Sequence, residues 1–184
     1  MINIIMSKSY RQIYVENLDA IRAKVIELKP LSLMNAVSVT FNRELSDQLM
    51  TMPEIIDAVE QFGGIQQVTR IVFNIVPPYN TDNAHCDYAG YYSFNIPILN
   101  FVDTYLRMYT PDPEMTLMSY TNAYGNTVRL WAVDTNRCQL THEVESIYPH
   151  VIDTRLPHQV INNHSTVRVN MLIRLKSETL DCMK

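Results

Sequence analysis

The sequence predicts a mainly β protein with helices at its N-terminal end. Apolar residues recur at helical spacing in the first third, and short β-rich runs separated by turn residues fill the rest. With 47% hydrophobic and 18% charged residues, the chain can bury a substantial core. Its 184 residues suit one compact domain. This order of elements favours a sandwich or barrel with helices covering one sheet face.

The N-terminal part, residues 1–67, is predicted to be mostly helical and to pack on the β part. Asn17 can cap a first helix, which Pro30 stops. Alternating apolar residues at 37–41 favour a short strand. A second helix starts near Pro53 and ends at Gly63-Gly64.

Residues 68–176 are predicted to form the β core, and residues 177–184 a loose tail. No repeat or linker divides the chain. The core contains nine β-rich runs, separated by segments rich in Pro, Asn, Asp and Gly. These runs are residues 69–76, 91–99, 104–110, 115–120, 127–133, 138–144, 149–153, 158–162 and 167–175.

Composition disfavours several classes of function. The net charge of -4 argues against broad binding to a phosphate backbone, so a nucleic-acid partner is not expected. Three cysteines without a CxxC spacing favour a reducing compartment, and we expect a cytoplasmic protein. We expect neither a signal peptide nor a membrane span, and the four glycines form no phosphate-binding loop.

The first motif that could carry chemistry is His85-Cys86-Asp87. On a strand, positions i and i+2 point to the same face, so this imidazole and this carboxylate would converge. The alternative is an ordinary polar loop end after the turn residues 77–80.

The second motif is His158 together with the strand at 167–175. A single histidine between Leu156 and Val160 on one strand face is often a core residue. The later strand has one aliphatic face and one face with Arg168, Asn170, Leu172 and Arg174. If the second face is solvated, Arg168 is a surface charge. If it lines a barrel interior, Arg168 needs an anionic partner, because an unpaired buried charge is costly.

Two histidines and one carboxylate can occupy one face of an octahedral Fe(II) and leave three positions open. A 2-oxo acid can take two of these positions and O₂ the third. An arginine suits the far carboxylate of such a co-substrate, because its planar guanidinium bonds both oxygens. The same ligand set also accepts Mn, Co, Ni or Zn.

The order of these residues resembles that of the Fe(II)- and 2-oxoglutarate-dependent oxygenase superfamily. His85-x-Asp87 is followed by about 70 residues of strands, then by His158, and then by Arg168 ten positions later. The stretch from Asp153 to Asn163 and the run Asn95–Ile98 are similar to the prolyl- and aspartyl/asparaginyl-hydroxylase-like branches. The resemblance covers roughly Val68–Leu175.

The resemblance implies a double-stranded β-helix, which is a cupin-like jelly-roll barrel with helices packed on its major sheet. It implies a dioxygenase that hydroxylates an unactivated C–H bond, with Fe(II) as the metal and with 2-oxoglutarate and O₂ as co-substrates. The expected substrate is a protein or peptide side chain, followed by an amino acid or another small metabolite. Nucleic-acid bases come third because the chain is acidic.

The resemblance also assigns residues. His85, Asp87 and His158 would bind the metal, and Arg168 would pair with the C5 carboxylate of 2-oxoglutarate. Asn170 stands where many members have a hydroxylic residue and could bond the same carboxylate, and Asn95 is a further candidate for the pocket. Tyr105 and Tyr109 could donate a phenol to the co-substrate, and core packing is the alternative for both.

Three other interpretations stay open. The barrel could be a non-catalytic cupin-like binding or structural module. It could be a cupin-type metal-dependent isomerase or dioxygenase, for which Glu143 is the nearest fourth ligand. A separate metal cluster of His142, Glu143 and Glu145 is less favoured, because Glu145 lies on the opposite strand face from His142.

Overall fold

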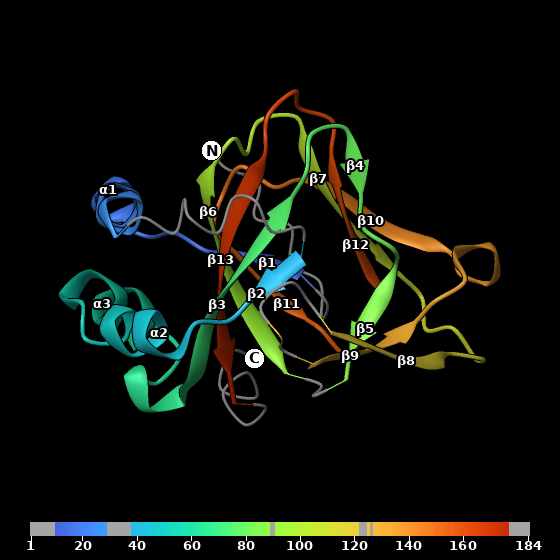
Figure 1. The fold of residues 1–184 in the computed structure, drawn as a ribbon, viewed down its shortest axis with the longest axis horizontal. Coiled ribbons are helices and arrows are strands. Elements are labelled where there is room, and N and C mark those ends of the chain that lie inside the picture. The colour runs from blue at the N-terminus through green and yellow to red at the C-terminus, as the bar shows by residue number, and fades with distance from the viewer. Residues whose placement is uncertain (1–9, 29–37, 89–90, 122–124, 126, 177–184) are drawn as a thin grey trace.

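The computed structural model describes residues 10–28, 38–88, 91–121, 125 and 127–176. These residues form two antiparallel β-sheets that face each other, with three short α-helices on one side (Figure 1). This is a mainly β sandwich of the jelly-roll kind, as the sequence predicts. The predicted tail at 177–184, which contains Cys182, lies outside the described residues.

The first sheet has six strands and the second has seven. The order in the first is β1 (Tyr10–Gln12), β11 (His150–Asp153), β6 (Tyr92–Leu99), β13 (Arg168–Leu175), β3 (Val68–Val76) and β2 (Ser38–Thr40). The order in the second is β10 (Leu140–Glu145), β7 (Thr104–Tyr109), β12 (His158–Asn162), β5 (His85–Asp87), β9 (Thr127–Ala132) and β8 (Thr116–Thr121), and β4 (Asn80–Thr81) also pairs with β12. All nine predicted runs contain a strand, whereas β1 is not predicted by the pattern.

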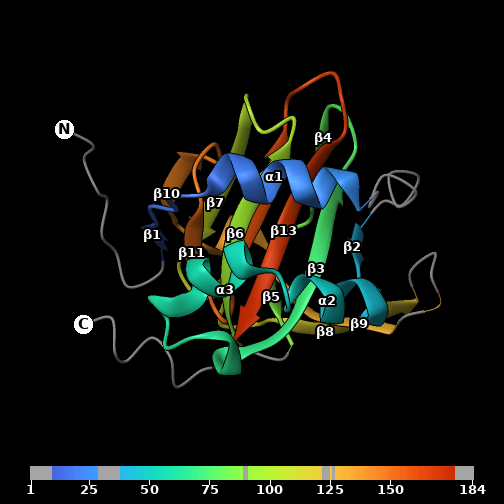
Figure 2. The same cartoon turned by 90° about the vertical axis from the view of Figure 1, so that its left-hand side faces the viewer.

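The helices are α1 (Leu18–Glu27), α2 (Arg43–Leu49) and α3 (Pro53–Glu60), with short 3₁₀ turns at Ile65–Gln67 and Thr135–Arg137. They lie in front of β6, β13 and β3 and cover the outer face of that sheet (Figure 2). The helices predicted after Asn17 and at Pro53 are confirmed, whereas α2 was not predicted from the sequence.

Helix α1 begins after Asn17 as predicted, but the prediction that the Asn17 side chain caps it is wrong, because this side chain makes no capping hydrogen bond. The backbone of Asn17 (φ -99°, ψ 31°) departs from the extended conformation in which a cap residue turns its side chain toward the first turn. Asn42 has an extended backbone and does cap α2, since its Oδ1 accepts from the Leu45 N–H at 3.0 Å. After α3 the chain turns at Gly63, whose φ of 93° favours glycine.

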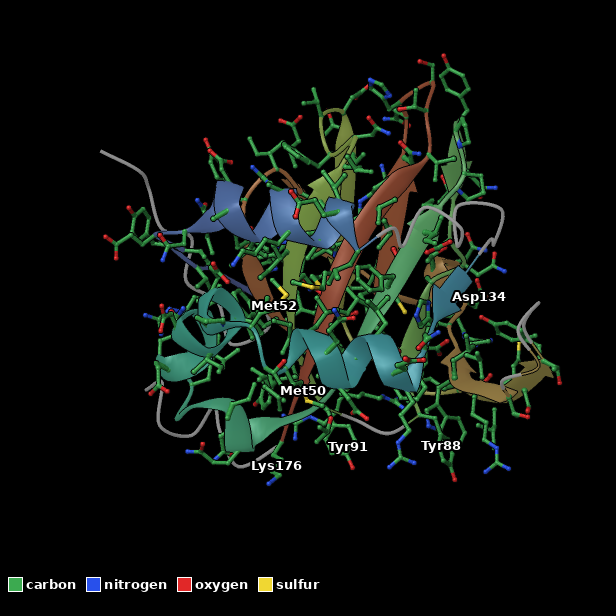
Figure 3. The ribbon with its side chains drawn as sticks, turned by 60° about the vertical axis from the view of Figure 1, so that its left-hand side comes forward. Met50, Met52, Tyr88, Tyr91, Asp134 and Lys176 are labelled. Carbon is green, nitrogen blue, oxygen red and sulfur yellow. The ribbon has the colours of Figure 1, made fainter. Side chains whose placement is uncertain are left out.

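Strand β13 has two chemically different faces. Met171, Ile173 and Leu175 are fully buried in the main apolar cluster, together with residues such as Ile21 of α1 and Ile55 of α3. Met50 and Met52 pack against the same cluster at the ends of the short helices (Figure 3). The other face of β13 points between the two sheets and is polar, which positions the site described below.

An ion pair between the buried Asp112, before β8, and the exposed Arg137, after β9, joins the two ends of the β8–β9 hairpin. The Asp112 carboxylate accepts from Arg137 Nε at 3.0 Å and Nη2 at 2.8 Å. It also accepts from the backbone N–H groups of Glu114 and Asp134. The hydrogen bonds from Arg137 hold the pKa of Asp112 well below its usual range. None of the described helices is long and apolar enough to cross a membrane.

We expect Ile173→Ala to lower the free energy of unfolding by about 3 kcal/mol, because it opens a cavity under the helices. Leu140→Ala, at a side chain that is 51% exposed, is the control and should change it by less than about 0.5 kcal/mol. Urea unfolding of both variants measures these differences. Equal losses would contradict the location of the core.

Candidate metal centre

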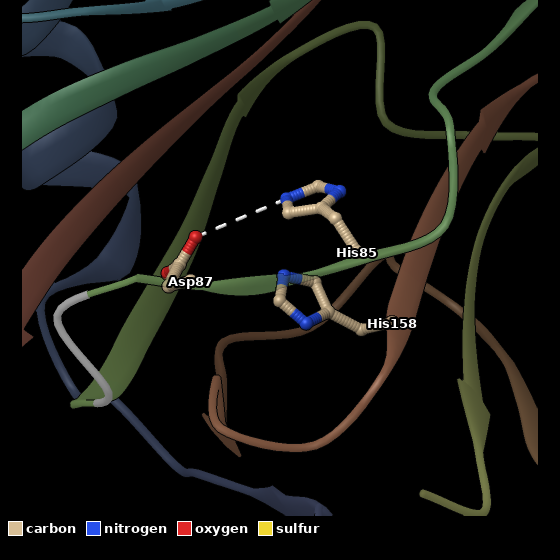
Figure 4. A group of neighbouring side chains, drawn as sticks. All are labelled: His85, Asp87 and His158. Carbon is tan, nitrogen blue, oxygen red and sulfur yellow. Dashed lines mark ion pairs between the residues drawn. The ribbon is translucent and has the colours of Figure 1, made fainter. Parts of the chain in front are cut away.

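The pairing of β12 with β5 brings two histidines face to face. His158 is the direct antiparallel partner of His85, and their ring centroids are 4.6 Å apart. Directly opposite residues in an antiparallel pair point to the same side of the sheet. Both imidazoles therefore lie on the inner face, between the two sheets (Figure 4).

Asp87 lies two residues after His85 on the same short strand and completes the group. Its Oδ1 is 3.8 Å from His85 Nε2. One potential ligand atom from each of His85, Asp87 and His158 lies within 4.8 Å of the others. Among the described residues this is the single group of three or more His, Cys, Asp or Glu side chains with such spacing.

Backbone carbonyls fix the orientation of both imidazoles. His85 Nδ1–H donates to the Asn83 carbonyl at 2.7 Å, and His158 Nδ1–H donates to the Leu156 carbonyl at 3.0 Å. A carbonyl can only accept, so Nδ1 carries the proton and Nε2 of the neutral ring keeps its lone pair. This arrangement is typical of metal-binding histidines.

The electrostatics prepare these groups for a cation. Burial lowers the pKa of His158 to about 4, so its imidazole is neutral at pH 7. Burial by itself raises the pKa of Asp87, but the positive charge of Arg174 and the two imidazoles outweigh this and hold it at about 2. At neutral pH the group therefore offers the ionised carboxylate of Asp87 and the neutral imidazole of His158, with Nε2 of His85 beside the carboxylate.

Arg174 is the main partner of Asp87. Its Nη1 donates to Asp87 Oδ2 in an ion pair, and both side chains are largely buried. This contact fixes one oxygen of the carboxylate and leaves Oδ1 on the side of His85. The sequence pattern contains one signal for it: Arg174 shares a strand face with Arg168 six residues earlier.

Arg168 is buried on the same inner face and is 2% exposed. Its Nη1 donates to Asn74 Oδ1 at 2.9 Å and its Nη2 to Ser146 Oγ at 3.2 Å. Within the described part of the chain no carboxylate forms an ion pair with Arg168, and its Nε has no hydrogen-bond partner. Burial lowers the pKa of Arg168 to about 10, so the guanidinium is still charged at pH 7.

One cavity of about 40 Å³ joins these groups. It is lined by His85, Asp87, His158, Arg168, Asn170, Arg174, Asn95 and other inner-face residues. By this measure the cavity has room for roughly three water molecules. Asn170 Oδ1 is buried without a partner, while Asn95 Oδ1 accepts from Ser93 at 2.9 Å.

Two further titratable groups, to which the sequence pattern assigned no role in the site, also line this cavity. Asp82 is held by Asn74 Nδ2 at 3.4 Å, and burial raises its pKa. His150 is 1% exposed and stacks on Tyr10 with 5.4 Å between ring centroids. Their positions depend on the loop before β5 and on the pairing of β11, which local patterns do not encode.

The other candidate residues from the sequence, Tyr105, Tyr109 and the group at His142, do not line this cavity. Tyr109 donates its phenol to Gln159 Oε1 at 2.7 Å, and neither Tyr105 nor Tyr109 lines the cavity. Leu106, between them on β7, points inward instead, because side chains alternate along a strand. The alternative cluster at His142 does not form in the described residues, and Glu143 pairs with Arg107.

The overall fold is similar to several solved structures. AviO1 from Streptomyces viridochromogenes Tue57 is 14% identical, with 93% of this chain and 91% of that chain covered and a TM-score of 0.50. A Pseudomonas putida prolyl-4-hydroxylase is 15% identical, with 91% and 88% covered and a TM-score of 0.47. The non-heme monooxygenase ThoJ, in a complex with Ni, is 15% identical, with 95% and 73% covered and a TM-score of 0.39.

These likenesses concern the fold alone. No family model and no curated protein sequence matches the chain. The side chains of the cavity are therefore the evidence for a chemical function.

The buried His150 predicts a specific pH dependence of stability. Burial lowers its pKa to about 4, whereas the unfolded chain binds this proton near the ordinary value of about 6.5. Above pH 6.5 His150 is neutral in both the folded and the unfolded chain, so it does not affect the free energy of unfolding. As pH falls from about 6.5 to about 4, the unfolded chain binds a proton that the folded chain does not, and the free energy of unfolding decreases. Over that range wild type should lose about 3 kcal/mol more than His150→Phe.

Urea unfolding of both proteins at several pH values measures this difference. His158 titrates in both proteins and cancels in the comparison. Parallel stability curves for wild type and His150→Phe would show that His150 is not buried in its neutral form.

Proposed function

We propose that the protein is an Fe(II)- and 2-oxoglutarate-dependent dioxygenase whose jelly roll is a double-stranded β-helix. His85, Asp87 and His158 hold the metal, and Arg168 anchors the co-substrate. One observation carries the proposal: a His-Asp-His group and a buried guanidinium that forms no ion pair with any described carboxylate line the same cavity.

The donor set fits Fe(II). Two imidazole nitrogens and one carboxylate oxygen make three protein ligands, which leave further positions of an octahedral metal open. The Nδ1 hydrogen bonds to Asn83 and Leu156 direct each Nε2 toward the centre. Arg174 keeps Asp87 ionised and oriented.

The other end of the cavity fits a carboxylate. Arg168 is a fixed buried cation with an unused Nε–H, so an anion that reaches it recovers the cost of its burial. Asn170 lies two residues further along the same face, and its Nδ2–H group can donate to the same anion. Because the cavity volume is about 40 Å³, a ten-atom dicarboxylate requires the lining side chains to move apart.

When bound, Fe(II) and 2-oxoglutarate supply the activation of O₂ for hydroxylation of a C–H bond, with release of succinate and CO₂. The chain's own residues bind and orient these groups, and the two sheets limit access of water to the centre. The proposed substrate is a protein or peptide side chain, an amino acid or another small molecule.

Removal of the anchor tests the proposal. Arg168→Met should weaken 2-oxoglutarate binding roughly 100-fold, because it removes the buried cation that pairs with the far carboxylate. It should also destabilise the ligand-free protein by about 1–3 kcal/mol, because it leaves the buried Asn74 Oδ1 and Ser146 Oγ without their donor. Calorimetry with Mn(II) as the metal measures the affinity, and urea unfolding measures the stability.

Arg43→Met removes an exposed arginine of α2 and is the matched control, with no expected effect on binding. Unchanged affinity in Arg168→Met would refute the anchor.

Removal of a metal ligand tests the metal site and the reaction. With Fe(II), ascorbate and O₂, wild type should release succinate slowly from 2-oxoglutarate even without substrate. His85→Ala should abolish this release and lower metal affinity, because it removes one of three ligands. Metal and 2-oxoglutarate binding without any succinate release would instead favour the non-catalytic binding module.

A further inference from the structure

Two arginines lie directly opposite each other at the end of the first sheet where β13 finishes. Arg174 of β13 is the antiparallel partner of Arg70 of β3, so both side chains belong to the same face of the sheet. Arg174 lines the metal cavity from this face, and so does Asn74, which has the same alternation as Arg70 along β3. Arg70 therefore belongs to the inner face, at its solvent-exposed end.

A shift in strand register lies beside this pair. Leu175 pairs with Val68 while Arg174 pairs with Arg70, so Thr69 is an extra residue on β3. Thr69 Oγ1 donates to the Arg174 carbonyl at 3.1 Å and ties the two strands together at the arginines. Such bulges are frequent next to functional sites, because they redirect the side chains beside them.

The two guanidinium groups share one carboxylate. Asp87 Oδ2 accepts from Arg174 Nη1, and Asp87 is also the carboxylate whose charge acts on Arg70. Among the described residues Arg70 has neither an ion pair nor a hydrogen bond from its side chain. Two positive charges and one negative charge leave an excess of one positive charge. Like charges directly opposite each other destabilise a sheet, so this pair favours a further anion.

Both arginines have donors that an anion can use. Arg174 is 8% exposed, and its Nε–H is buried without a hydrogen-bond partner in the described part of the chain. Arg70 can be reached from solvent, while partial burial of its guanidinium and the charge of Arg174 lower its pKa. An oxyanion bound by both would satisfy the buried Nε–H and reduce the repulsion between the two cations.

The surroundings of Arg70 add a further donor. Tyr91 lies close enough to influence Arg70, and its phenol O–H can donate to an anion. In Figure 3, Tyr91 and Lys176 lie along the lower rim of the molecule, at this end of the sheets. Asp87 is the one described carboxylate that acts on Arg70. The groups at this rim therefore favour an oxyanion over a cation.

We propose that Arg70 and Arg174 together bind a carboxylate or phosphate group of the substrate beside the metal centre. Asp87 links the two sites, since its Oδ2 contacts Arg174 and its Oδ1 lies 3.8 Å from His85 Nε2. The role in substrate binding rests on the proposed function, whereas the binding of an anion does not.

This anion site is separate from the proposed anchor of the co-substrate. Arg168 and Arg174 are six residues apart on β13, which is roughly 20 Å along a strand. Two anions can therefore bind at the two ends of the inner face without competing for one guanidinium.

Inorganic phosphate tests the anion site in the metal-free protein. A phosphorus NMR titration at pH 7 should show binding to wild type, and Arg70→Gln should weaken it roughly tenfold or more, because it removes a charge-assisted donor. Acetate should displace the phosphate, whereas acetamide, its uncharged counterpart, should not. Arg70→Gln should not lower the urea midpoint of unfolding, because it removes a contact between like charges.

Two variants control for location. Arg43→Gln removes an exposed arginine of α2 and should leave phosphate binding unchanged. Arg168→Met should leave the binding that depends on Arg70 in place. Equal phosphate affinity in wild type and Arg70→Gln, absence of binding to wild type, loss of binding in Arg168→Met, or displacement by acetamide would overturn the proposal.

A second measurement tests the position beside the metal. With Mn(II) and saturating 2-oxoglutarate, bound Mn(II) should increase the phosphorus relaxation rate of bound phosphate. The co-substrate is present so that phosphate cannot take its positions on the metal. Arg70→Gln should reduce this effect roughly tenfold at the same low phosphate concentration, and His85→Ala gives the background from free Mn(II).

The outcomes separate this site from the proposed function. Phosphate binding that depends on Arg70 but shows no relaxation effect, although Mn(II) and 2-oxoglutarate are bound, would overturn the position beside the metal. If wild type binds neither Mn(II) nor 2-oxoglutarate, the proposed function fails, while the anion site is judged by the titration of the metal-free protein alone.

Discussion

The site depends on one backbone register, the pairing of His158 with His85. Because side chains alternate between the two faces of a strand, a slip of one residue in β12 would turn His158 out of the cavity and Gln159 into it. The same strand pairs with β7 along its whole length, which fixes this register over five residue pairs. The geometry of the His-Asp-His group is therefore a property of the second sheet as a whole.

Strand β13 connects this site to the stability of the fold. Its aliphatic face is buried under the helices and supplies much of the main core. Its inner face buries Arg168, Asn170 and Arg174, and each of these has one buried polar atom without a partner. Unsatisfied buried polar atoms destabilise a fold by about 1–3 kcal/mol each, so the apolar face must offset a cost that the inner face creates. Such local conflicts with stability are expected at functional sites.

The inner cavity has a polar, cationic end, which Arg168 and the amides of β13 and β6 form. The overall charge of -4 conceals this feature, since the buried cation contributes one charge to the sum but dominates its own surroundings.

The sequence by itself determined the class of fold, all nine predicted β runs, and the helices after Asn17 and at Pro53, because these depend on periodic patterns and turn residues close along the chain. It also singled out His85, Asp87, His158 and Arg168 by residue type and order, and their roles stay predictions. Only the tertiary structure decided that these side chains share one cavity, that Arg174 pairs with Asp87, and that Tyr109 bonds Gln159 instead of facing inward. The physical reason is that strand register and contacts between sheets join residues far apart in sequence, which a local pattern cannot encode.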